Sequence, residues 1–133
     1  AGAPAMSRAQ AARKGCNLEQ ARQRLVDARQ FLEAAELLDA PDVVATNAIH
    51  AAIAASDAIT CHSLGQRSAG ANHLGAVDLL RMVDARSATA LKRALDRRTQ
   101  AAYESADLSR SAAANCVKWA RQLLGEAESR LEA

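Results

Sequence analysis

The chain has 133 residues, half of them hydrophobic and 2% aromatic, and its formal net charge is +2. This length suits a single domain, and so few aromatic side chains exclude a platform that stacks single-stranded nucleic acid. The longest apolar run, around residues 43–61, is interrupted by Asn47, His50 and Asp57. We therefore expect no membrane span.

Much of the hydrophobic half is alanine, the strongest helix former, and this composition predicts an all-α protein. We expect residues 1–6, AGAPAM, to be a disordered vector remnant and residues 7–133 to form one helical-bundle domain. Alanine buries less apolar area than leucine or phenylalanine. A second subunit is therefore expected to supply part of the stability, in a homodimer.

Apolar periodicity and capping residues predict four long helices, one short helix and no strand. Asn17 and Gln20 resemble a capping box that opens a helix over 18–39. Pro41 suits the first turn of a second helix, which ends near Cys61. Three further helices are expected over 73–83, 88–103 and 110–131, the first two capped by Asn72 and Ser87. These elements predict an antiparallel four-helix bundle with one additional short helix.

The cysteines are three in number, far apart in the chain and without a CxxC pair: Cys16, Cys61 and Cys116. An odd and scattered set is typical of free thiols in a reducing cytoplasm. We therefore expect a cytoplasmic protein without a disulfide frame or a zinc ribbon.

Asn47, His50 and Asp57 form a polar stripe, because their spacing places them on one face of the second helix. Buried polar groups need partners, so this polar stripe is either an interhelical hydrogen-bond set or the floor of a cleft. His62 and His73 could join it only from another helix face or across a loop. We therefore expect neither a metal site nor a cofactor.

Residues 81–98 carry six basic and two acidic side chains, and Arg93, Arg97 and Arg98 lie near the end of this run. A run of this kind is usually a solvated helix face. The functional interpretation is a basic patch that binds phosphate or an acidic partner.

Three segments resemble the HEPN family, whose name stands for higher eukaryotes and prokaryotes nucleotide-binding. NAIHAAIAASDAI (47–59) is similar to its small-residue second helix, and HLGAVDLL (73–80) is similar to its short third helix. RRTQAAYESADLS (97–109) contains Arg98-x-x-Ala101-x-Tyr103, which resembles the segment typical of non-toxin members. The resemblance covers about residues 43–128.

The resemblance implies a compact helical dimer with a cleft between its subunits. Many members act in toxin–antitoxin or phage-defence systems, as ribonucleases or beside small nucleotidyltransferases. The ribonuclease members carry an arginine followed, four to six residues later, by a histidine. After Arg97 and Arg98 the matched positions hold other residues, namely Ala102, Tyr103, Glu104 and Ser105. Arg67 and His73 have the required spacing, but they span a predicted loop.

The leading interpretation is a HEPN-like binding module of bacterial type that contacts RNA or a nucleotide. The resemblance implies that an antitoxin or a nucleotidyltransferase-type protein is a partner. The residues expected to bind the nucleic acid or nucleotide are Arg93, Arg97, Arg98 and Tyr103.

The alternative is an active, metal-independent ribonuclease with a site drawn from His50, Asp57, Arg98 and Tyr103. In that site Arg98 would stabilise the phosphorane charge and His50 would move the proton. If the family arrangement holds, the polar stripe faces Arg98 and Tyr103, and Asp57 pairs with an arginine. A third interpretation is a structural bundle that serves a protein partner.

Overall fold

The computed structural model describes residues 13–69, 73–103 and 108–132. In chain order the elements are β1 (Arg13–Gly15), α2 (Leu18–Leu37), α3 (Pro41–Leu64), β2 (Gln66–Ser68), α4 (Leu74–Arg81), α5 (Ala85–Tyr103) and α6 (Arg110–Leu131). The prediction of a mostly helical chain is confirmed. The expected vector remnant and the expected Asn72 cap lie outside the described residues.

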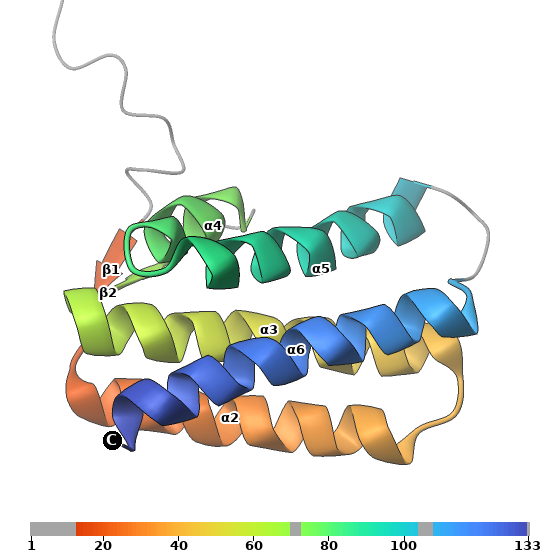
Figure 1. Ribbon diagram of the computed structural model, residues 1–133, viewed down its shortest axis with the longest axis horizontal. Coiled ribbons are helices and arrows are strands. Elements are labelled where there is room, and N and C mark those ends of the chain that lie inside the picture. Colours follow the sequence, from red (N-terminus) through yellow and green to blue (C-terminus); the bar gives the residue numbers. More distant parts are fainter. Residues whose placement is uncertain (1–12, 70–72, 104–107, 133) are drawn as a thin grey trace, which may run out of the picture.

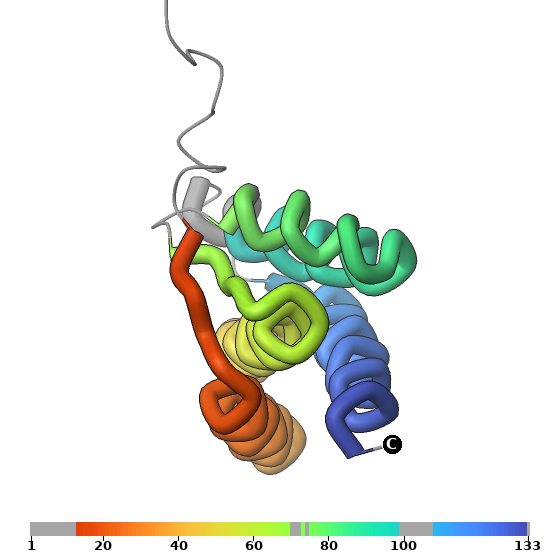
Figure 2. Tube along the Cα trace, turned by 90° about the vertical axis from the view of Figure 1, so that its left-hand side faces the viewer, coloured from red at the N-terminus to blue at the C-terminus, as the bar shows by residue number. Residues whose placement is uncertain are grey.

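The central element is α3. It runs between α2 and α6, while α4 and α5 lie on its other side (Figure 1). Viewed from the end, these helices surround α3 (Figure 2), and every residue from 51 to 61 is buried. Among the described helices only α3 is long and apolar enough to cross a membrane, and 72% of its apolar window is buried inside the protein.

Local signals set the helix ends. Asn17 and Gln20 form the predicted capping box, since each side chain accepts the other residue's backbone N–H. Pro41 lies in the first turn of α3, as predicted, and the helix ends at Gly65, whose φ of 65° favours glycine. The predicted Ser87 cap is wrong. The Asp84 carboxylate accepts from the Ser87 backbone N–H instead, and α5 begins at Ala85.

The expectation of no strand is also wrong. β1 and β2 form a two-stranded antiparallel sheet in which Lys14 is paired with Arg67. Each strand has three residues, which is too short for an alternating pattern to be recognised in the sequence. The pair is held at the end of α3, where the Cys16 N–H donates to the Gly65 carbonyl at 2.9 Å.

The expectation of free thiols at Cys16 and Cys61 is contradicted, because the two residues form a disulfide. They are 45 residues apart, so only the return of the chain past the end of α3 brings them together. Cys116 is buried and free, and burial raises its pKa to about 11. Disulfides persist mainly in oxidising compartments, so the cytoplasmic prediction loses the support that it took from the cysteines.

Candidate functional site

Asp57 is the buried carboxylate around which the candidate site is built. It lies on α3 one turn before Cys61, in a helix that is otherwise lined by alanine, isoleucine and serine, and is 5% exposed. Arg24 of α2 donates to Asp57 Oδ2 from Nε at 3.1 Å and from Nη2 at 3.0 Å. The third guanidinium nitrogen of Arg24 binds Asp27 at 3.0 Å. Two carboxylates thus fix the Arg24 side chain at the α2–α3 contact.

The strand pair brings further cations to the same carboxylate. Arg67 of β2 places Nη1 3.9 Å from Asp57 Oδ2, and Lys14 is its cross-strand neighbour on β1. These side chains line a cavity of about 340 Å³ beside α3, which we call the basic pocket. Its lining consists of Lys14, Arg24, Ile53, Asp57, Arg67, Ser68, Ala69 and His73. The lining therefore holds three permanent cations and one carboxylate.

Two polar atoms at this strand pair lack a partner. Arg13 Nε and Ser68 Oγ are buried and make no hydrogen bond within the described residues. Arg13 and Ser68 are cross-strand partners, and Ser68 lines the basic pocket. A buried donor without an acceptor costs about 1–3 kcal/mol. Donors of this kind beside a cationic cavity are suited to bind an oxyanion.

His73 and His50 are the two imidazoles of this region whose pKa values are shifted. Burial lowers the pKa of both imidazoles, and the positive charge of Arg98 lowers both further. The charge of Arg24 also lowers the pKa of His50, and His50 in turn lowers the pKa of His73. The four groups His50, His73, Arg24 and Arg98 are therefore linked by electrostatic interactions, and they come from α3, the start of α4, α2 and α5. An anion placed among them would favour the protonated imidazoles.

The pKa of the Asp57 carboxyl is subject to opposing effects. Burial raises the pKa of its carboxyl, while the charges of Arg24 and Arg67 act in the lowering direction. The basic pocket has an excess of positive charge even with Asp57 ionised. Asp57 therefore organises the two arginines and leaves charge on Lys14 and the arginines for a ligand.

The polar stripe is not a single network. The Asn47 amide donates to the Val43 carbonyl of its own helix at 2.9 Å. His50 is at the surface, where its ring stacks on Phe31 of α2 with centroids 5.2 Å apart. Only Asp57 makes an interhelical ion pair, and no hydrogen bond joins the three side chains within the described residues.

The arginines expected to form one patch point in different directions. The charge of Arg98 lowers the pKa values of His50 and His73, so Arg98 lies near the basic pocket. The charge of Arg97 instead acts to lower the pKa of Cys116 on α6. Arg93 lines a separate groove. Asp57 does pair with arginines, and the partners are Arg24 and Arg67 rather than an arginine of the predicted patch. Tyr103 ends α5, and its side chain lies outside the described part of the structure.

Three residues of the site were not identified from the sequence: Lys14, Arg24 and Ser68. Arg24 had a detectable signal, since it borders the buried stripe of Ala21, Leu25 and Ala28 on α2. A basic residue beside a core-facing stripe is a natural partner for a buried carboxylate. Lys14 and Ser68 had no such sequence signal, because the strand pair that carries them was not predicted.

Arg67 and His73, with the arginine–histidine spacing of the ribonuclease members, both line the basic pocket. Within the described residues no three His, Cys, Asp or Glu side chains converge to hold a metal ion. The chemistry available is therefore charge-assisted binding of an oxyanion, with imidazoles at its edge. No family model, curated protein or solved structure matches the chain.

Proposed function

We propose that the protein is a HEPN-like, dimeric variant of the four-helix bundle whose basic pocket binds the phosphate groups of RNA or of a nucleotide. It would act as a binding module in a toxin–antitoxin or defence setting, with an antitoxin or a nucleotidyltransferase-type protein as partner. The observation that carries the proposal is the basic pocket itself. It combines Lys14, Arg24 and Arg67 with a buried Ser68 hydroxyl, which has no hydrogen-bond partner among the described residues, in a cavity of about 340 Å³.

The chemistry of the lining supports phosphate over an uncharged ligand. Arginine and lysine bind phosphate through charge-assisted hydrogen bonds, and a hydroxyl and an imidazole add directional donors. Arg98 adds a further cation beside the basic pocket, because it lies within electrostatic range of His73 in the pocket lining. A polyanion longer than one phosphate can therefore extend from the basic pocket toward α5.

The test is binding of a fluorescein-labelled single-stranded RNA by the full chain, measured by anisotropy at two salt concentrations. We expect Arg67→Gln to weaken binding about tenfold and to reduce the salt slope by about one phosphate contact. The matched control is Lys92→Gln, which removes one charge from an exposed ion pair with Asp96 at 3.0 Å on α5. Equal effects of the two substitutions would show that only overall charge matters and would overturn the proposal.

A second candidate, a metal-independent ribonuclease, is favoured by one observation. Arg67 and His73 line the same cavity, so in this candidate an arginine stabilises the phosphorane while His73 takes the proton of the attacking 2′-hydroxyl. The protonated His73 then gives this proton to the departing 5′-oxygen as the P–O5′ bond breaks. Cleavage of a labelled RNA in the presence of EDTA tests it. The expected products carry a 2′,3′-cyclic phosphate, and His73→Gln should abolish cleavage while RNA binding persists. Intact RNA after prolonged incubation with the parent chain would reject this candidate.

A further inference from the structure

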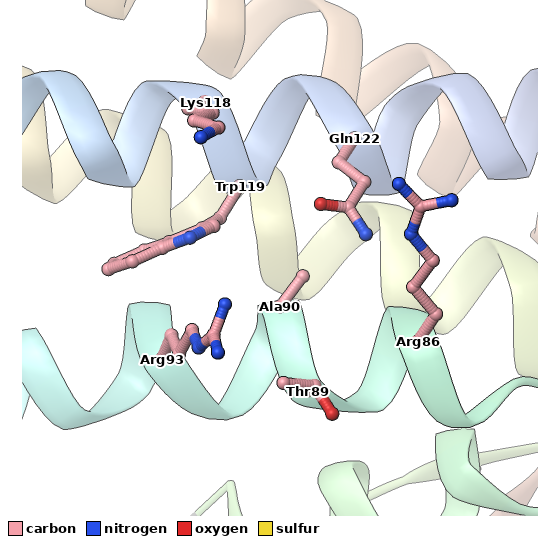
Figure 3. A pocket seen from close by; sticks show the side chains of 7 residues that line it. All are labelled: Arg86, Thr89, Ala90, Arg93, Lys118, Trp119 and Gln122. Atoms are coloured by element: carbon pink, nitrogen blue, oxygen red, sulfur yellow. The ribbon is translucent and has the colours of Figure 1, made fainter.

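A second cavity lies between α5 and α6, and it shares no lining residue with the basic pocket. Its volume is about 340 Å³, within the usual range for small-molecule sites. Arg86 reaches from α5 toward α6, and Trp119 and Gln122 reach from α6 toward α5 (Figure 3). The small, buried side chain of Ala90 lies between them and leaves the space open. We call this cavity the tryptophan groove.

The tryptophan groove has an excess of positive charge, although Asp84, just before α5, lies within electrostatic range of Arg86. Arg86, Arg93 and Lys118 line it, and no acidic residue does so within the described part of the chain. The acidic residues on the same two helices are engaged elsewhere, as in the pairs Lys92–Asp96 at 3.0 Å and Glu126–Arg130 at 2.7 Å. Three cations around one cavity repel one another, so a bound anion would be stabilised there.

The aromatic wall distinguishes this groove from an ordinary basic surface. Trp119 is partly buried against the core, and its indole lies between α6 and α5 on the side of Arg93 (Figure 3). Gln122, one turn later on α6, offers an amide donor and an acceptor. An apolar ring, an amide and several cations together suit a flat ligand that carries negative charge at one end.

We propose that the tryptophan groove binds one small anion in which a phosphate group is attached to a planar ring, of the size of a nucleoside monophosphate. Arg93 and Lys118 bind the phosphate, Trp119 contacts the ring, and Gln122 binds a polar edge of the ring, with Arg86 beyond Gln122 adding positive charge (Figure 3). This site is separate from the proposed function of the basic pocket, and neither site needs the other. The same phosphate-and-ring unit could be a free nucleotide or the terminal residue of an RNA.

The experiment uses intrinsic fluorescence, because Trp119 is the only tryptophan in the chain. The full chain is titrated with adenosine 5′-monophosphate, with adenosine, with inorganic phosphate and with a short RNA bearing a 5′-phosphate, under selective tryptophan excitation. We expect saturable quenching by adenosine monophosphate, at a midpoint about tenfold below those of adenosine and of phosphate. A lower midpoint for the free nucleotide than for the RNA would identify the free form as the ligand, and the reverse order would identify the RNA terminus.

The variants separate this site from the others. Arg93→Gln and Lys118→Gln should each raise the midpoint about tenfold, while Lys92→Gln outside the groove and Arg67→Gln in the basic pocket should leave it unchanged. Failure of Arg67→Gln to affect RNA binding would count against the proposed function alone. The groove proposal would be overturned by the absence of saturable quenching or by equal midpoints for phosphate and adenosine monophosphate. A change in Trp119 fluorescence that depends only on protein concentration would also overturn the groove proposal, since a second copy of the chain would then occupy the groove.

Discussion

Asp57 and Arg24 are the residues whose pairing decides how the candidate site is organised. A buried carboxylate is stable only with a partner that satisfies it, and Arg24 donates two nitrogens to the same oxygen at 3.0 and 3.1 Å. Arg24 is only partly buried, with 26% of its side chain exposed. Removing the Asp57 carboxylate should therefore lower the free energy of unfolding less than removing the Arg24 guanidinium.

This pair can be tested by a double-mutant cycle. We expect Arg24→Ala to lower the free energy of unfolding by about 2–4 kcal/mol, because it leaves buried Asp57 with only Arg67 at 3.9 Å. Asp57→Ala should cost about 1–3 kcal/mol, and the double variant should cost less than the sum. Denaturant unfolding gives the three values. Arg98→Ala is the control, expected to stay within about 0.5 kcal/mol, and strict additivity at positions 24 and 57 would contradict the pairing.

The lowered pKa values of His50 and His73 predict how the stability of the fold changes with pH. Their pKa values are lowered in the folded state by burial and by Arg98, whereas in the unfolded state they titrate near about 6.5. The unfolded state then binds more protons, so the free energy of unfolding should fall as the pH drops through 6.5 and should be insensitive to these groups above it. Thermal melting between neutral and mildly acidic pH measures this. His73→Gln should flatten the curve, and a melting temperature that rises on acidification would contradict the assignment.

At the scale of elements, the disulfide and the short sheet attach the start of the described chain to the end of α3. Cys16 follows β1 directly, and Cys61 lies in the last turns of α3. The same strand carries Lys14 into the basic pocket. The position of one pocket wall therefore depends on a covalent link outside the pocket.

Reduction should accordingly affect both stability and binding. The bond closes a loop with a sequence separation of 45 residues, and its loss should lower the free energy of unfolding by about 2–4 kcal/mol. RNA affinity should fall as well, because β1 is no longer held against β2. Unfolding and anisotropy with and without dithiothreitol measure the two effects. The Cys16→Ser, Cys61→Ser double variant should not respond to the reductant, and a response there would show that the effect does not come from the Cys16–Cys61 disulfide.

At the scale of the whole molecule, the core is built largely from alanine. Buried alanines occur on every described helix, and the large apolar side chains buried completely are few: Ile59, Leu79, Leu80, Leu91 and Leu123. Such a core buries little apolar area for its size. At the same time, Leu37, Leu38 and Val43 are exposed where α2 turns into α3. Both features favour burial of a further surface by self-association.

We therefore expect a homodimer with twice the chain mass of 14.0 kDa in sedimentation at micromolar concentration. Leu37, which is 84% exposed, can be replaced by lysine to place a charge on this apolar corner without disturbing the core. Leu37→Lys should shift the mass toward the monomer, whereas Arg121→Lys, a conservative change at the surface, should not. A monomer for the parent chain at these concentrations would refute the dimer and any site shared between subunits.

The sequence by itself determined the helices, because the forces that start and end them act over one or two turns. Asn17 with Gln20, Pro41 and the alanine-rich periodicity placed α2, α3 and α6 within a few residues of their observed ends. Only α5 began earlier than predicted, because Asp84 and not Ser87 provides the capping oxygen. The family resemblance also suggested an arginine partner for Asp57, and in the structure Asp57 is paired with Arg24 and Arg67.

Which arginine it is, and what surrounds it, was decided by the tertiary structure. Arg24 and Asp57 are 33 positions apart and meet because α2 packs along α3, and Cys16 meets Cys61 because the chain passes the same end of α3 twice. Contacts at this separation depend on how helices pack and on where loops return, which no local pattern encodes. The basic pocket could not be predicted from the sequence for that reason, although the sequence had drawn attention to Asp57, Arg67 and His73 separately.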